Sequence, residues 1–379
     1  MNDRKEEVTK KNSKTIAKTP PITDVPYTGI EVLMDPGSEK RQPMQGFDDD
    51  YVDIVDYIVR CTHKIWEEHG IGLIYTHYGH NVLIHTADGM TYGRDKVIAD
   101  TIKTQAAFPD VRLFADDVIW SGNDQDGFHS SHRIVWVAHN TGYSLYGPPT
   151  GKRVVRQGIA HCFVKENRVV EEWIARDELA LIRQLGFDEI ELAKEMAAQA
   201  AASGVKGPLP VTEGEVQRLR GQMAPDLYPA QDNAKFDIED FVRRSFYEIW
   251  NWRLLNKIDD YYVSNYWAYA STNRQLYGLG DLKGYILALM AAFPDLAINI
   301  DHMCWLGDEE SGYRVATRWT LVGTHSGPGA YGSATGKRIR LMGITHSDVK
   351  DGKFVKERIV FDEFALLKQI YWPAGTEEL

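Results

Sequence analysis

The chain has 379 residues, of which 43% are hydrophobic and 11% aromatic, and its formal net charge is −11. This length predicts more than one globular domain, and the negative charge argues against nucleic acid as a partner, because phosphate binding needs a basic surface. No apolar run reaches the roughly 18 residues of a membrane span, and the first residues lack the apolar stretch of a secretory signal. We therefore expect a soluble, cytoplasmic protein with no membrane partner.

Residues 1–45 are rich in Lys, Pro, Thr and Ser, which predicts a flexible N-terminal arm. Apolar residues first gather in "YTGIEVLM", residues 27–34, where partial order is expected. A long polar arm favours a homodimer in which the arm of one subunit reaches across the other.

The first folded domain is predicted at 46–187. Helical spacing of Ile54, Ile58 and Ile65 predicts an opening helix. A short strand, "NVLIHT" at 81–86, precedes a second helix at 96–108 that Pro109 ends. The rest of the domain is typical of strands joined by hairpin turns. Helices followed by a long antiparallel sheet predict the α+β class.

Residues 188–233 are predicted to link two domains. The segment "DEIELAKEMAAQAAA" at 188–202 consists of good helix formers, and "SGVKGPLP" then ends that helix. A second helix is expected in "TEGEVQRLRGQM" at 212–223. Such a helical linker would hold the domains at a set distance.

The second domain, 234–379, is predicted to be a copy of the first. "AAFPD" occurs at 106–110 and at 291–295, and "TGKR" at 150–153 and at 335–338, both 185 positions apart. His161 and His346 keep this separation, and so do Asp177 and Asp362. Upstream of Tyr92 the separation is 184, as for Trp66 and Trp250. These constant separations indicate a tandem duplication.

The order of elements, with these residues, resembles the SnoaL-like polyketide cyclases of the nuclear-transport-factor-2-like class. The resemblance rests on "YG…D" before the second helix, "AAFPD" after it, a T-G-x-x-x-x-G-x-x-T-G-K-R hairpin at 141–153 with a looser version at 324–338, and a last strand ending in Asp before "LALIRQLG" or "FALLKQI". It implies two tandem cone-shaped α+β barrel domains, each with helices packed on a curved antiparallel sheet. It also implies pairing through the convex faces of the sheets, which two copies can satisfy as a pseudo-twofold pair within one chain.

The resemblance also implies catalytic residues. In the family, the Asp of the last strand acts as general acid and base in an aldol-type ring closure, together with a His of the neighbouring strand. Carried onto this chain, the residues are Asp177 with His161 and Asp362 with His346.

Strand alternation gives an independent expectation about these residues. A three-residue loop Lys350-Asp351-Gly352 would pair His346 with Lys356, which puts His346, Arg358 and Asp362 on one face. The same register in the first copy puts on one face Ile159, His161, Phe163, Trp173 and Asp177. We expect this mostly apolar face to line the inside of the cone, where burial would raise the pKa of the Asp towards neutrality.

Each candidate also has a structural interpretation. Asp177 and Asp362 stand where an N-cap of the following helix would be, and His161 and His346 fit a buried core. The substrate-binding candidates are Trp66, Tyr78, Asn81, Arg133, Phe163 and Trp173 in the first copy, and Trp250, Tyr262, Asn265, Arg318 and Arg358 in the second. The aromatic residues also fit a core or pocket wall, and Arg133 and Arg318 also fit partners of buried carboxylates.

No phosphate-binding loop, nucleophile elbow or dinucleotide fingerprint is present, so no cofactor is expected. The first copy has extra histidines, but none has a metal-binding helical spacing, so no metal is predicted either: His77, His80, His85, His129, His132 and His139.

We therefore expect a small-molecule enzyme of the lyase, cyclase or isomerase type that uses Asp/His acid–base chemistry. A non-catalytic ligand-binding or assembly protein is the alternative. A further alternative is an epoxide-hydrolase-like enzyme, which needs an Arg between two Asp in the cone. The hairpins "GYSLYGPPTGKR" and "GPGAYGSATGKR" differ, which predicts that the pockets prefer different ligands or that only one acts. The first copy is favoured as the more enclosed aromatic pocket.

Overall fold

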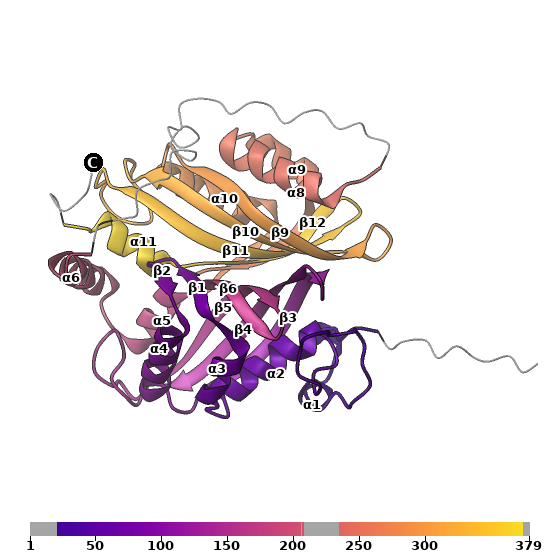
Figure 1. The fold of residues 1–379 in the computed structure, drawn as a ribbon. Helices are drawn as coiled ribbons and strands as arrows, with labels where there is room; N and C mark the ends of the chain where they lie inside the picture. The colour runs from indigo at the N-terminus through magenta and orange to yellow at the C-terminus, as the bar shows by residue number, and fades with distance from the viewer. Residues whose placement is uncertain (1–20, 206, 208–234, 374–379) are drawn as a thin grey trace, which may run out of the picture.

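The computed structural model describes residues 21–205, 207 and 235–373, and within them the chain forms two six-stranded sheets, each accompanied by helices (Figure 1). The strand order is β2-β1-β6-β5-β4-β3 in the first sheet and β8-β7-β12-β11-β10-β9 in the second. The same order in both sheets confirms two tandem α+β domains. The sheets are mixed, because β1 runs parallel to β6, and β7 parallel to β12.

In the first domain, the helices and strands follow the predicted order. The helices are α2 (Ile54–Trp66), α3 (Ile74–His77), α4 (Arg94–Ala107) and α5 (Glu178–Leu185). The strands are β1 (Tyr78–Thr86), β2 (Gly89–Tyr92), β3 (Arg112–Asn123), β4 (Gly127–His139), β5 (Arg153–Lys165) and β6 (Arg168–Arg176). The Asp53 side chain caps α2 by accepting a hydrogen bond from the Asp56 backbone N–H.

The second domain repeats this order. Its helices are α8 (Ile238–Phe246), a π-helical continuation (Tyr247–Asn251), α9 (Ile258–Tyr261), α10 (Gly278–Ala292) and α11 (Glu363–Ile370). Its strands are β7 (Tyr262–Ala270), β8 (Arg274–Tyr277), β9 (Ala297–Asp308), β10 (Gly312–Thr324), β11 (Arg338–Lys350) and β12 (Lys353–Phe361). Both α4 and α10 end just before the Phe of an "AAFPD" segment.

The first linker helix is present as α6 (Glu189–Ala202), which Asp188 caps. Its Ala193 and Ala197 are buried, and the helix packs against α11. The second predicted linker helix, 212–223, lies outside the described residues.

The part of the N-terminal arm that the structure describes is folded against the first domain. It contains a 3-10 helix (Val25–Tyr27) and α1 (Ile30–Met34), and Val25 and Leu33 belong to the first domain's core. Asp24 forms a 2.7 Å ion pair with Arg314 of the second domain. These residues were expected in a flexible arm, but their apolar side chains are buried, so the folded region begins well before residue 46. Residues 1–20 lie outside the described residues.

The outer faces of the two sheets pack on each other, with the first domain below and the second above in Figure 1. Ile159 and Ala175 form one buried cluster with Ile344 and Val360, their equivalents 185 positions away. Equivalent residues contact each other near a twofold axis. The two copies therefore pack as a pseudo-twofold pair within one chain, as the resemblance implied.

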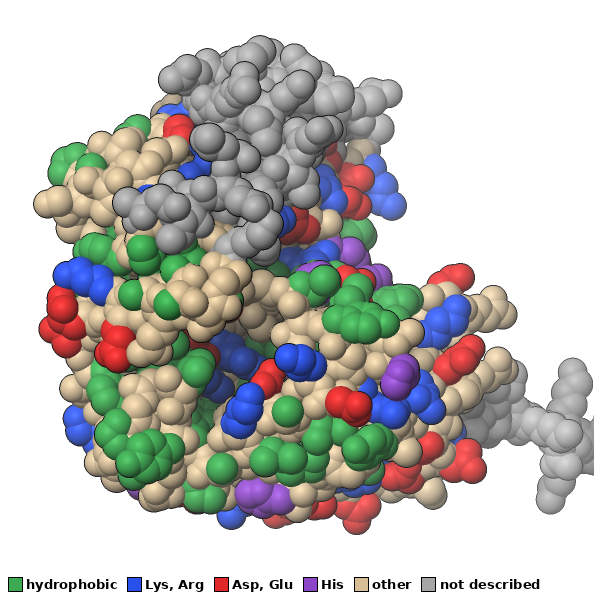
Figure 2. Space-filling model, turned by 60° about the vertical axis from the view of Figure 1, so that its left-hand side comes forward, with side chains coloured by type: hydrophobic (Ala, Val, Ile, Leu, Met, Phe, Trp, Pro, Cys, Tyr) green, Lys and Arg blue, Asp and Glu red, His purple; other side chains and the backbone are tan. Residues whose placement is uncertain are grey.

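The surface in Figure 2 carries interspersed acidic and basic side chains, with a hollow near the centre of this face that has Lys and Arg side chains at its wall. On this face the basic groups form no continuous patch of the kind that nucleic acid binding needs. Among the described residues, no helix is long and apolar enough to cross a membrane. The three cysteines are buried free thiols, as predicted: Cys61, Cys162 and Cys304.

Candidate active site

The first domain encloses a cavity of about 220 Å³ between its helices α2 and α4 and the concave face of its sheet. The corresponding space in the second domain is only about 30 Å³. The two cones, which share one fold, therefore differ in whether they can hold a ligand.

Larger side chains fill the second cone. Thr62 of the first copy corresponds to Phe246, Ile134 to Trp319, and Arg176 to Phe361; these three replacements line the small space. The Trp319 ring lies against Gly343, where a Cβ atom would come within 2.2 Å of the ring. The duplication has thus left one open cone and one that is packed as a core.

Glu172 is the acidic group most deeply placed in the open cavity. It stands on β6, is 7% exposed, and accepts a hydrogen bond from the Tyr78 hydroxyl at 3.4 Å. Burial raises the pKa of the Glu172 carboxyl, and the neighbouring Arg176 charge opposes that rise. A buried carboxyl with a raised pKa is suited to accept and return a proton as a general base and acid.

Tyr78 and two arginines supply hydrogen-bond donors to the same cavity. Burial and the nearby Glu172 raise the pKa of Tyr78 well above its ordinary value, so this hydroxyl keeps its proton. Arg156 forms a 2.8 Å ion pair with Glu178. Burial lowers the pKa of Arg176 from its high ordinary value. Donors of this kind stabilise negative charge that develops on a carbonyl oxygen.

His132, on β4, also lines the cavity and is 3% exposed. Its Nε2 has no hydrogen-bond partner among the described residues. Burial lowers the pKa of His132 to about 3, so its imidazole is neutral at physiological pH. It can therefore accept or donate one hydrogen bond to a ligand.

The equivalent carboxyl in the second domain, Glu357, is held by its own neighbours. The Tyr266 hydroxyl donates to it at 2.6 Å and the Ser347 hydroxyl at 2.7 Å. Burial raises the pKa of Glu357 to about 7. With both oxygens bonded inside a filled cone, Glu357 is a core residue.

Four of the predicted substrate-binding residues line one of the two cones, and two others line neither cone. Trp66 and Tyr78 line the first cavity, and Trp250 and Tyr262 line the small second space. Asn81 and Asn265 are exposed and line neither.

The expectation that the His and Asp face forms the inside of the cone is wrong. His161 lies opposite Trp173 in the β5–β6 register, and Phe163 and Asp177 share their face as alternation predicted. That face, however, packs against the second domain, and apart from Ile159 the cavity is lined by the alternate residues of the same strands. An apolar interdomain face and an apolar cone have the same sequence pattern.

The predicted hairpin loop also differs from the observed turn. Lys350 pairs with Lys353, so the turn has two residues, and a register shift lies between Asp348 and Val349. His346 therefore lies opposite Arg358 rather than Lys356.

Asp177 and Asp362 are N-caps of the helices that follow them. Asp177 accepts a hydrogen bond from the Ala180 N–H at 3.3 Å and, through its other oxygen, one from the Thr272 N–H of the second domain at 2.7 Å. One oxygen of Asp362 accepts from the Phe364 and Ala365 N–H groups. Burial raises the pKa of Asp177 to about 6. Neither residue lines the cavity of the first cone or the small space of the second, so the geometry of the cones does not support the catalytic role predicted from the family pattern.

The remaining candidates also lie on the interdomain side of the sheets. His346 is 2.8 Å from the Ser131 hydroxyl, and His161 stands beside His129 and His302. Arg133 forms a 3.0 Å ion pair with Asp116. The guanidinium of Arg318 lies 3.7 Å from the centre of the Trp173 ring, and that of Arg358 lies 4.3 Å from the Trp267 ring.

The sequence prediction missed the polar groups that do line the cavity, namely Glu172, His132, Arg156 and Arg176. A usable signal was present for Glu172, because an acidic residue recurs 185 positions later as Glu357 on a strand of apolar and basic neighbours.

A model of the SnoaL-like polyketide cyclase family matches residues 57–185 and 240–370. A SnoaL-like polyketide cyclase from Agrobacterium tumefaciens C58 is 19% identical over 35% of this chain and 96% of its own, with a TM-score of 0.30. TsrD from Streptomyces laurentii is 18% identical over 37% of this chain and 100% of its own, with a TM-score of 0.32. IdmH from Streptomyces antibioticus is 22% identical, with coverages of 35% and 96% and a TM-score of 0.30. No curated protein matches the chain.

Proposed function

Because the chain belongs to the SnoaL-like polyketide cyclase family, we propose that its first domain is a cofactor-independent small-molecule enzyme of the cyclase, lyase or isomerase type. The observation that carries the proposal is the cavity of about 220 Å³ into which the buried Glu172 projects. The proposed base is Glu172, because it is the carboxyl that lines this space with a raised pKa.

In the proposed ring closure, Glu172 takes a proton from a carbon next to a carbonyl group, and the electron pair of that C–H bond forms an enolate. The enolate carbon then attacks a second carbonyl of the same molecule, so that one C–C bond forms and the electron pair of the C=O bond moves to oxygen. Protonated Glu172 returns the proton to that oxygen. Tyr78, Arg176 and His132 would donate hydrogen bonds to the oxygens that become negative.

The lining of the cavity supports a mostly apolar substrate that carries carbonyl groups. Trp66, Ile134 and Trp136 give it apolar walls. Tyr78 and Arg176 interact with Glu172, and several threonines add further polar groups to the lining. Pockets that bind small molecules commonly combine such walls with a few orienting polar groups. The wall includes a single Asp, Asp100, whereas epoxide-hydrolase chemistry of the expected kind needs two beside an Arg.

The non-catalytic alternative fits the second domain. Its cone is packed by its own side chains, and its outer face covers that of the first domain. We propose that it acts as a scaffold for the first domain. The homodimer predicted from the polar arm stays a prediction, which light scattering of the purified chain would check.

A matched pair of substitutions tests the function. Glu172→Gln and Glu357→Gln make the same change at equivalent positions, and turnover is measured with a synthetic aromatic polyketone that cyclises by an intramolecular aldol step. Glu172→Gln should lower turnover by about 10²-fold or more, and Glu357→Gln should leave it near the wild-type value. Equal activity of all three proteins would contradict the proposal.

A further inference from the structure

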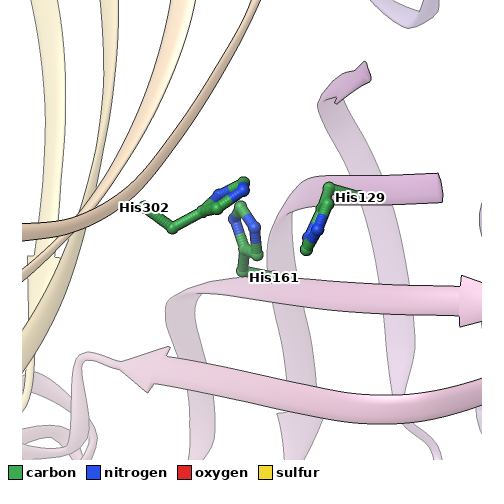
Figure 3. A group of neighbouring side chains, drawn as sticks. All are labelled: His129, His161 and His302. Atoms are coloured by element: carbon green, nitrogen blue, oxygen red, sulfur yellow. The ribbon is translucent and has the colours of Figure 1, made fainter. Parts of the chain in front are cut away.

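Three histidines from both domains converge at the edge of the interdomain interface. His129 stands on β4 and His161 on β5 of the first domain, and His302 stands on β9 of the second (Figure 3). One ring nitrogen from each lies within 4.8 Å of the corresponding nitrogens of the other two. The ring centres of His129 and His302 are 4.2 Å apart, and the ring centres of His161 and His302 are 4.8 Å apart.

Four of the six ring nitrogens of this cluster lack hydrogen-bond partners within the described part of the chain. His161 is fully buried, and neither its Nδ1 nor its Nε2 has a hydrogen-bond partner. Nδ1 of His129 and Nδ1 of His302 are also unpaired. A buried polar atom without a partner costs free energy and calls for an explanation, and a ligand shared by the three rings provides one.

The pseudo-twofold axis provides an internal comparison. The positions equivalent to His129, His161 and His302 are Arg314, His346 and Asp117, each 185 residues away. There the charged groups lie beside one another: Arg314 pairs with Asp117 at 3.0 Å, and Asp117 lies 3.7 Å from His346 Nδ1, which makes no hydrogen bond to the described residues.

Ser131 completes the symmetry-related site through its 2.8 Å contact with His346. The residue equivalent to Ser131 on the other side is Ala316, which has no hydroxyl to offer His161. The duplication has thus replaced an ion-paired, hydrogen-bonded site by three imidazoles for which the described residues provide no carboxylate or hydroxyl hydrogen bond to the unpaired nitrogens.

The charged groups near the cluster bear on whether it can hold a cation. The Arg318 charge opposes a bound cation, but the neighbouring Asp301 and Glu171 carboxylates offset that charge.

We propose that His129, His161 and His302 bind one Zn²⁺ ion that joins the two domains, with a fourth ligand position open to water. Three neutral imidazoles and one open position are a common ligand set for Zn²⁺. At a Zn–N distance of roughly 2.0–2.1 Å, the ligand nitrogens would move about 1 Å closer than they stand, which rotation of the side chains provides.

The site is distinct from the cavity of the first domain. His161 and His129 point to the opposite side of the sheet from Cys162 and His132, which line the cavity. The ion would therefore hold the domains together rather than contact a substrate of the cavity, and the proposal does not depend on the proposed function.

The test uses the full chain without a histidine tag, freed of metal with a chelator and then titrated with Zn²⁺ in a calorimeter. One ion per chain should bind. His302→Asn and His129→Asn should each weaken binding by about 10²-fold or more, since even loss of an outer-shell partner weakens metal binding 10- to 100-fold. His139→Asn is the matched control, because this half-exposed histidine contacts Asp110 at 2.6 Å and lies outside the cluster. It should leave the affinity unchanged.

Two further readouts keep the result unambiguous. Circular dichroism checks that each variant is folded, and Co²⁺ should give the visible spectrum of a tetrahedral site in the wild-type protein and in His139→Asn only. Zn²⁺ should raise the melting temperature of the wild-type protein and not that of His302→Asn. The proposal is overturned if Zn²⁺ binds with less than one ion per chain, or if folded His302→Asn and His129→Asn bind it as tightly as the wild-type protein.

Discussion

Glu172 on β6 and Glu357 on β12 occupy equivalent positions in the two domains, but their surroundings differ. Hydroxyl groups of Tyr266 and Ser347 bind both oxygens of Glu357. Glu172 meets the Tyr78 hydroxyl at 3.4 Å beside an open cavity. One duplicated carboxyl has become part of a core, and the other faces a space that a ligand can enter.

The Glu357 carboxyl predicts a pH dependence of stability. Its pKa is raised to about 7 from an ordinary 4.5, so the folded state binds this proton more tightly than the unfolded state does. Its contribution to stability is full below pH 4.5 and is lost as the pH rises through 7, by about 3 kcal/mol in all.

Urea unfolding of the wild-type protein and of Glu357→Gln from pH 4 to pH 8 measures this contribution. The difference in unfolding free energy between the two proteins should change with pH in favour of the variant at high pH. A difference that stays constant over this range would show that the pKa of Glu357 is the same in the folded and the unfolded protein, which would contradict the raised pKa.

Trp319 should be responsible for much of the filling of the second cone. Trp319→Ile introduces the residue found at the equivalent position, Ile134, and removes the hydrogen bond from the Trp319 ring N–H to Thr345 (2.9 Å). We expect a loss of about 2–4 kcal/mol in unfolding free energy. Ile134→Val is the control in the open cone, with an expected loss of about 1 kcal/mol. Equal losses in urea denaturation would contradict the difference in packing.

Filling the first cone should abolish ligand binding there. Thr62→Phe copies Phe246 of the second domain and places an aromatic ring in the cavity of about 220 Å³. Binding of a fluorescent aromatic ketone should weaken at least 10-fold, because the substitution occupies the space that the ligand needs. Thr76→Phe is the control, because Thr76 is an exposed residue of α3 that does not line the cavity.

Asp177 and Asp362 should respond differently to Asn. Each oxygen of Asp177 accepts a different N–H group, so in Asp177→Asn the amide NH₂ faces a donor and the protein should lose about 1–3 kcal/mol. A single oxygen of Asp362 accepts both its hydrogen bonds, and Asn is as good an N-cap as Asp. Asp362→Asn should therefore change stability by only a few tenths of a kcal/mol.

The same two variants also test the catalytic role that the family pattern implied for these residues. With the carboxylates outside the cavity, turnover of both variants should stay near that of the wild-type protein. A drop of about 10²-fold or more in either variant, with its fold intact, would restore the acid–base role to that aspartate.

The sequence by itself determined the duplication and the α+β class, and its resemblance to the SnoaL-like family implied the pairing of the sheets. The duplication and the class follow from local or repeated patterns, such as "AAFPD" recurring 185 positions later and Pro109 ending a helix. Alternation likewise puts His161 and Trp173 on one face. Alternation has a period of two, so it states which residues share a face.

Only the tertiary structure decided which of the two faces is concave. The β5–β6 face with His161 packs on the second domain, so the cavity lies on the other face of the sheet, where Glu172 and His132 line it. The three-histidine cluster was likewise invisible in the spacing along the chain, since His302 joins His129 and His161 only when the domains pack. Both faces of these sheets are buried, one by helices and one by a second sheet, and burial on both sides removes the polar alternation that would have told the inside from the outside.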